Sequence, residues 1–242
     1  MTKQEKLNNE LIEKTKKGHL EEVKSLIKQG ADVNVKDNDG NTALISSSYN
    51  GHLEIEQGAD VEAKDKTGKT ALIESSSNGC LDIVKCLLDN GADVEAKDKT
   101  GKTALIWSSN NGHLDIVKYL IEQGADVNVK NNDGNTALIW SSFERHLDIV
   151  KYLIKQGADI NVKDNNGYTA LHYIKRNNML DGLIPYVYNY MFFEELYNDL
   201  RIEQKHILFK HFMKNKELLE QVNPRMMKNF IPDINKWKNN LK

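Results

Sequence analysis

Residues 98–130 read DKTGKTALIWSSNNGHLDIVKYLIEQGADVNVK, and this stretch decides the fold. Its opening Asp-Lys-Thr-Gly is typical of a turn, because glycine takes a positive φ without strain. Thr103 is a good helix N-cap, and Gly112 is placed to end the short helix that begins there. Apolar residues at helical spacing predict a second helix from about Leu114, which Gly124 ends. The stretch therefore predicts turn, helix, turn, helix and loop.

The same pattern recurs along the chain. The triplet Gly-Ala-Asp occurs at intervals of 28, 33, 33 and 33 residues, at positions 30–32, 58–60, 91–93, 124–126 and 157–159. A second marker, Gly-x-Thr-Ala-Leu, keeps the same intervals and starts at Gly40, Gly68, Gly101, Gly134 and Gly167. Neither helix of one unit can bury its apolar face alone, so successive units must stack.

This unit resembles the ankyrin repeat, and the resemblance covers about residues 4–178. It implies an all-α fold, an α-solenoid of stacked helix-turn-helix repeats with β-hairpin-like loops. It divides a repeat domain at 1–178 into a cap at about 4–36, a shortened repeat at about 37–64, repeats at about 65–97, 98–130 and 131–163, and a partial repeat at 164–178.

Two sets of histidine positions test the resemblance. In the family, a histidine in the first helix ties neighbouring repeats by hydrogen bonds. Only His172 keeps it here, and isoleucine replaces it at Ile45, Ile73, Ile106 and Ile139, so apolar packing must replace those bonds. A second set recurs before the second helix, and the resemblance implies that its members bond the backbone near the interhelix turn: His19, His52, His113 and His146.

The pattern breaks at two places inside the repeats. The shortened repeat at about 37–64 lacks five residues, about 1.4 helical turns, so we predict a weak point or a kink near residues 53–58. That deletion either forms a hinge or is drift that the neighbouring repeats tolerate. Arg145 replaces the interhelix glycine, where a positive φ costs a non-glycine residue on the order of 1 kcal/mol.

Composition changes after residue 178. Five of the six methionines lie in 179–242, and apolar residues recur there at helical spacing. We expect a helical C-terminal cap or a small helical module.

Length and charge exclude several classes of protein. The 242 residues carry 33 basic and 35 acidic side chains, and a formal net charge of -2 argues against a nucleic-acid binder. Cys80 and Cys86 are the only cysteines, so a disulfide scaffold is excluded and a reducing compartment is favoured. No apolar run approaches the roughly 20 residues of a membrane span. We expect a monomeric cytoplasmic protein, with delivery into a host cell left open.

The sequence contains no complete catalytic or cofactor-binding motif. Gly-Lys-Thr at 68–70 and 101–103 resembles the end of a phosphate-binding loop, but Ala63 and Ala96 stand where that motif needs glycine. No nucleophile–base pair or metal-ligand spacing is evident. We expect no enzymatic activity, no cofactor and no metal.

The candidate binding surface lies on the loop tips and the first helices. The two central tips are basic and would suit an acidic segment of a partner; their lysines are Lys66, Lys69, Lys99 and Lys102. Trp107, Trp140 and Tyr173 hold one equivalent repeat position, which is Ser46 and Glu74 in the earlier repeats. Nearby candidates are Tyr49, Asn110, Asn111 and Phe143. The alternatives are solvated charged loops and aromatic packing between repeats.

Two functions fit this sequence. One is an interaction scaffold that binds a partner protein through the concave groove and hairpin tips. The other is an adaptor or effector, in which the groove selects a target and residues 179–242 recruit a second protein such as a ubiquitin ligase.

Overall fold

The computed structural model describes residues 2–51, 58–180 and 182–183. Their secondary structure is helical apart from one isolated β-bridge between Lys163 and Thr169. The helices of these residues are α1 (Lys3–Lys16), α2 (Leu20–Lys28), α3 (Ala43–Asn50), α4 (Ala71–Asn78), α5 (Leu81–Asp89), α6 (Ala104–Asn111), α7 (Leu114–Glu122), α8 (Ala137–Phe143), α9 (Leu147–Lys155) and α10 (Ala170–Arg176). The predicted all-α class is confirmed.

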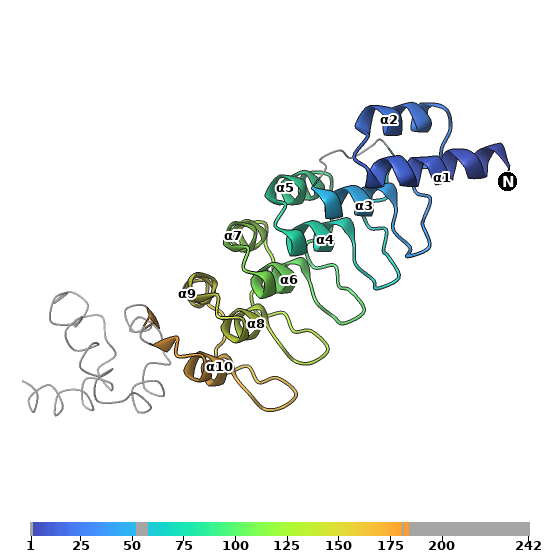
Figure 1. Ribbon diagram of the computed structural model, residues 1–242. Coiled ribbons are helices and arrows are strands. Elements are labelled where there is room, and N and C mark those ends of the chain that lie inside the picture. The colour runs from blue at the N-terminus through green and yellow to red at the C-terminus, as the bar shows by residue number, and fades with distance from the viewer. Residues whose placement is uncertain (1, 52–57, 181, 184–242) are drawn as a thin grey trace, which may run out of the picture. The chain divides into compact units, whose positions relative to one another are not determined.

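The chain divides into two compact units, Met1–Tyr173 and Ile174–Lys242. In the first unit the inner helices α3, α4, α6 and α8 stand in one row, and the outer helices α5, α7 and α9 stand in a second row (Figure 1). Each inner helix packs on the next, with α1 against α3 at the N-terminal end. Long loops leave the inner row on its free side (Figure 1). The predicted solenoid of helix pairs is therefore confirmed for this unit, whereas the predicted helical C-terminal segment falls almost entirely outside the described residues.

Local sequence signals set the ends of the inner helices. In each of α3, α4, α6 and α8 a threonine side chain accepts a hydrogen bond from the N–H three residues later, which satisfies one of the free donors of the first turn. These caps are Thr42, Thr70, Thr103 and Thr136. Glycine in the left-handed conformation ends α3, α4 and α6. Arg145 has a φ of 67° at the equivalent place after α8, so the predicted strained position is confirmed.

The core lies between the two rows of helices. The isoleucines that replace the family's histidine are at most 2% exposed, as expected of apolar packing between repeats: Ile45, Ile73, Ile106 and Ile139. Outer helices contribute one apolar face each, and in α7 Val117 and Leu120 are fully buried. Burial of this kind stabilises by about 1.5–3 kcal/mol for each large side chain.

Two ladders of hydrogen bonds join the loops of successive repeats. At the tips, the backbone N–H groups of Lys66, Lys99, Asn132 and Asn165 donate to carbonyl groups of the preceding repeat. Nearer the helices, a side-chain oxygen of each repeat accepts the N–H of the following Gly-Ala-Asp aspartate, at 2.7–2.8 Å, from Asn34, Glu62, Glu95 and Asn128. Each repeat is therefore tied to its neighbours by polar as well as apolar contacts.

The recurring histidines also join repeats. The Nε2 atoms of His113 and His146 lie 3.0 Å from the carbonyl oxygens of Ser77 and Asn110, so these two residues bond the backbone as predicted. His19 differs, because its Nδ1 lies 3.1 Å from a carboxylate oxygen of Glu22. His52 and the predicted weak point near residues 53–58 fall on a segment, 52–57, that lies outside the described residues.

Substitution of Gly79 tests this histidine contact. A Cβ added at Gly79 would meet the His113 ring at 2.7 Å, whereas nothing lies within 4 Å of one added at Gly91. Both residues have a positive φ, so alanine costs about 1 kcal/mol at either site. We expect Gly79→Ala to lower the free energy of unfolding by about 2–3 kcal/mol, because it also displaces the His113 bond to Ser77. Urea denaturation measures both variants, and an equal loss in Gly79→Ala and Gly91→Ala would contradict the contact.

Candidate functional site

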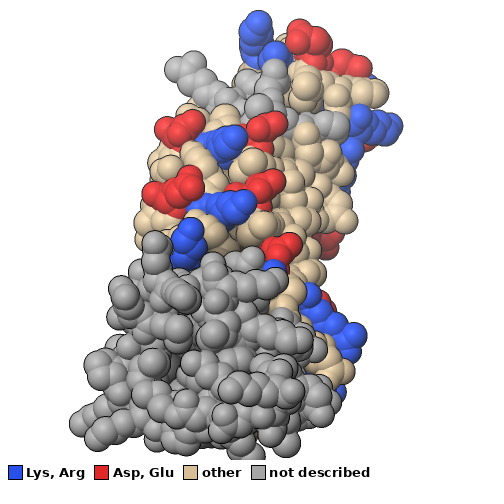
Figure 2. Space-filling view, turned by 90° about the vertical axis from the view of Figure 1, so that its left-hand side faces the viewer, with Lys and Arg blue, Asp and Glu red and all other residues tan. Residues whose placement is uncertain are grey.

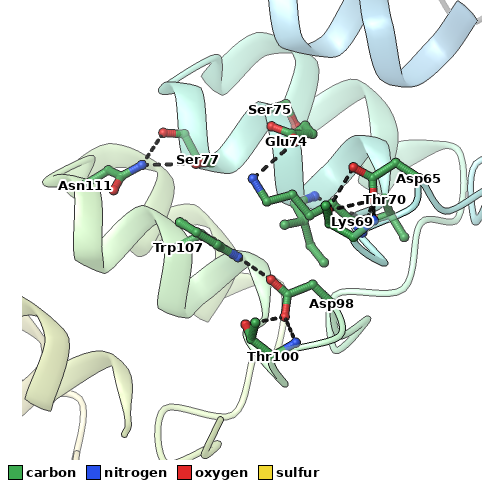
Figure 3. Close-up of polar contacts among 12 residues, drawn as sticks. Asp65, Lys69, Thr70, Glu74, Ser75, Ser77, Asp98, Thr100, Trp107 and Asn111 are labelled. Atoms are coloured by element: carbon green, nitrogen blue, oxygen red, sulfur yellow. Dashed lines mark hydrogen bonds and ion pairs between the residues drawn. The ribbon is translucent and has the colours of Figure 1, made fainter. Parts of the chain in front are cut away.

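The aspartate at the start of a loop can connect that loop to the inner-helix face, which we define as the free face of α3, α4, α6 and α8 with the adjoining loop tips. Asp98 is 8% exposed, and its Oδ1 accepts the backbone N–H groups of Thr100 and Lys102 at 2.8 and 3.0 Å. Its Oδ2 accepts the indole N–H of Trp107 at 2.9 Å (Figure 3). The carboxylate therefore fixes the turn and the orientation of the ring together.

The same arrangement recurs with different donors. In the last repeat, Asp164 accepts the Tyr173 hydroxyl at 3.0 Å. In the first, Asp37 accepts the Lys16 ammonium at 2.8 Å. Burial on its own would raise the pKa of Asp37, but the Lys16 ammonium and the N–H groups of the loop lower that pKa to about 2.

Lysine and tryptophan side chains alternate along the centre of this face. The Lys102 ammonium lies 4.2 Å from the ring centroid of Trp107 and 3.9 Å from that of Trp140. The Lys69 ammonium lies 4.4 Å from the same Trp107 ring centroid and pairs with Glu74 at 3.1 Å (Figure 3). Burial lowers the pKa of Lys102, and this effect outweighs the negative charge of Asp98, which acts to raise that pKa. Cation–π attraction strengthens as the cation loses water, so this row is held in a defined order.

An aromatic cluster continues the row toward the C-terminal end of the unit. Phe143 meets Trp140 and Tyr173 edge to face, with ring centroids 5.9 and 5.5 Å apart. Tyr168 stacks on His172 at 4.1 Å. Phe143 and Tyr168 remain 45% and 44% exposed, which makes this cluster accessible to a partner.

The structure brings most of the predicted binding residues together. Lys69, Lys102, Trp107, Trp140, Phe143 and Tyr173 form one connected row through the contacts above. Lys66 and Lys99 are exposed on the tips, Asn110 is half-buried at the end of α6, and Tyr49 is 61% exposed at the end of α3. Asn111 has a packing role, since its Nδ2 donates to the Ser77 carbonyl at 2.7 Å.

Sequence reasoning did not identify the aspartates as partners of the rings. The available signal was a fixed separation of nine residues, from Asp98 to Trp107 and from Asp164 to Tyr173. It also did not identify the exposed stack of Tyr168 on His172.

The fourth repeat departs from this arrangement. Asn131 holds the place of the aspartate, and its Oδ1 accepts the N–H groups of Asp133 and Asn135 at 3.0 and 2.8 Å. Its second terminal atom is therefore an amide donor, where Asp98 offers an acceptor. The buried indole N–H of Trp140 has no hydrogen-bond partner among the described residues. An unpaired buried donor costs about 1–3 kcal/mol.

The outer helices present a different surface. Figure 2 shows acidic and basic side chains interleaved over them, and Lys118 pairs with Asp115 at 3.7 Å and Lys151 with Asp148 at 3.4 Å. Ion pairs of this kind on a helix surface contribute little to the stability of the fold, and they leave no excess of one charge there. The row of lysines and rings is a feature of the inner-helix face.

The described residues contain neither a metal-binding cluster nor a membrane-spanning helix. Within residues 2–51, 58–180 and 182–183, no group of three or more His, Cys, Asp or Glu side chains is placed to hold a metal ion. Over the same part of the chain, no helix combines the length and the apolar character needed to cross a membrane.

The family model for ankyrin repeats in sets of three copies matches residues 11–98, 54–131, 76–164 and 124–186. These matches overlap and together cover most of the chain. No curated protein sequence matches the chain.

Asn131→Asp should give Trp140 the hydrogen-bond acceptor that Trp107 has in the preceding repeat. The new carboxylate would keep both backbone bonds and would accept the Trp140 indole N–H, as Asp98 does for Trp107. We expect the free energy of unfolding to rise by about 1–2 kcal/mol, the size of a hydrogen bond to a charged group. The control is the same change in a Trp140→Phe background, where the gain should vanish. A gain of equal size in both backgrounds would contradict this account.

The bond between Lys16 and Asp37 predicts a change with pH. The pKa of Asp37 lies below its usual 3.8, so its ionisation stabilises the fold above about pH 4, and this stabilisation is lost as pH falls toward 2. Lys16→Met should raise the pKa of Asp37 toward 3.8, measured by NMR titration of its carboxyl carbon. Lys17→Met, which removes an ion pair to Glu13, should leave it unchanged.

Proposed function

Because the chain belongs to the ankyrin repeat family, whose repeats generally serve as protein–protein interaction modules, we propose that its inner-helix face binds a segment of a partner protein. The observation that carries this proposal is the row from Lys69 through Trp107, Lys102 and Trp140 to Phe143. Tryptophan and tyrosine are among the residues that most often dominate binding energy at interfaces.

The side chains of this row are already held in fixed positions, which supports a binding role. Trp107 is already oriented by Asp98, and lysines already flank its ring, so a partner that docks there orders few side chains. Binding therefore costs less conformational entropy than on a surface of free side chains. Exposed Lys66 and Lys99 on the tips favour a segment that carries acidic residues beside them.

The proposal assigns no catalytic residue, in keeping with a family that is typically a binding scaffold. We propose a monomeric scaffold in the cytoplasm, and the free thiols of Cys80 and Cys86 support a reducing compartment. The alternative adaptor function depends on residues 179–242, nearly all of which lie outside the described residues.

Removal of the indole rings tests the proposal. Partners captured from cell lysate by the full chain should be lost with Trp107→Ala and with Trp140→Ala, because truncation of a central anchor costs about 2 kcal/mol or more, roughly 30-fold in affinity. Tyr119→Ala is the matched control, since Tyr119 lies on the outer helix α7 with Lys85 over its ring at 5.9 Å. Circular dichroism must show that each variant remains folded. Unchanged capture by folded tryptophan variants would reject the proposed surface.

A further inference from the structure

A cavity of about 370 Å³ opens on the inner-helix face beside α3 and α4. Its lining includes Ser46, Tyr49, Asp65 and Glu74, and Ile45, only 2% exposed, is among them. The position that carries Trp107, Trp140 and Tyr173 in later repeats is Ser46 and Glu74 here. The hollow therefore lies where these two repeats have no ring to fill the face.

One hydrogen-bond acceptor in this cavity lacks the donor that its equivalents have. Oδ2 of Asp98 accepts the Trp107 indole, and Oδ2 of Asp37 accepts the Lys16 ammonium. In the second repeat the residue nine positions after Asp65 is Glu74, which when ionised can only accept. Among the described residues, the Thr67 hydroxyl is the one donor to Asp65 Oδ2, at 2.9 Å, and it is shared with Oδ1 at 2.8 Å.

Among the residues that the structure describes, the charges around the cavity leave one negative charge without an ion-pair partner. The Lys16 ammonium lies 2.8 Å from Asp37, and the Lys69 ammonium lies 3.1 Å from Glu74 (Figure 3). With those two pairs balanced, the carboxylate of Asp65 remains. The phenol ring of Tyr49, 61% exposed, is part of the same lining and offers a flat apolar surface.

We propose that this cavity binds an arginine side chain of the partner protein, an inference that rests on the proposed function of the same face. A guanidinium has five N–H donors in a planar fork, so it can donate to Asp65 and Glu74 while its plane stacks on Tyr49. It also supplies the one positive charge that the cavity lacks. A lysine ammonium has the charge but neither the fork nor the stacking plane.

The test is an NMR titration of the isotope-labelled full chain with N-acetyl-arginine amide. We expect saturable shifts of the Ser46, Tyr49 and Glu74 resonances, and binding at least about tenfold weaker for N-acetyl-citrulline amide, which keeps the shape but has no charge. N-acetyl-lysine amide should also bind more weakly. Equal binding of the three compounds, or shifts away from the cavity, would overturn the inference.

Three variants identify the residues responsible. Glu74→Gln should weaken arginine binding about fivefold or more, whereas Asp115→Asn, the same change of charge on the outer helix α7, should not. Glu74→Trp should abolish binding, because an indole there can donate to Asp65 as Trp107 donates to Asp98 and fill the cavity. Full binding by folded Glu74→Trp would overturn the inference.

These outcomes are separate from the test of the proposed function. Tyr119→Ala, on the outer helix α7, should leave the arginine titration unchanged, because Tyr119 does not line the cavity. If Trp107 and Trp140 prove necessary for partner capture but arginine does not bind, the face is a binding surface and the arginine inference is wrong. If arginine binds but partner capture is insensitive to both tryptophans, the proposed function has failed instead.

Discussion

The aspartate or asparagine that opens each loop is the contact on which the order of the loops and the inner-helix face depends. In Asp98, one oxygen accepts two backbone N–H groups and shapes the turn, and the other orients a ring on the inner-helix face. The shaped turn places the Lys99 N–H on the carbonyl of Thr67 in the preceding repeat. A buried acceptor that satisfies several donors stabilises more than isolated bonds would, because each donor would otherwise be left unpaired. In this repeat, loop order, stacking and ring orientation are therefore coupled through the single side chain of Asp98.

The sequence was sufficient for the fold and partly sufficient for the site, and the difference has a physical reason. Thr103 and Gly112 act within a few residues of their own position, so the caps and the helix ends could be predicted from local chemistry. The position of Lys102 between two indole rings depends on the next repeat, and a periodic pattern does not report such contacts. Trp140 shows the limit most clearly. It occupies the same repeat position as Trp107, yet Asn131 replaces the aspartate and the indole N–H has no hydrogen-bond partner within the described part of the chain.

At Arg145 and Asn131 the side chain departs from the repeat pattern, but the backbone keeps its conformation. Arg145 keeps a positive φ without glycine, and Asn131 keeps the turn without a carboxylate, so each preserves the backbone at a local cost. Such costs are of the order of 1–3 kcal/mol and are tolerated because neighbouring repeats share the stabilisation of the stack. The backbone conformation of the repeat therefore persists even where a side chain has changed.

A fixed backbone with one variable position per repeat gives the inner-helix face a direction. The position nine residues after the loop aspartate or asparagine is serine and glutamate in the first two repeats, tryptophan in the next two and tyrosine in the last. A polar hollow near Asp65 is thus followed by lysines that flank indole rings, and then by the exposed ring of Phe143. A segment lying along this face would meet these surfaces in chain order, and a reversed segment would place its charges against the wrong groups. Under the proposed function, complementarity of charge would then select the orientation of a partner as well as its composition.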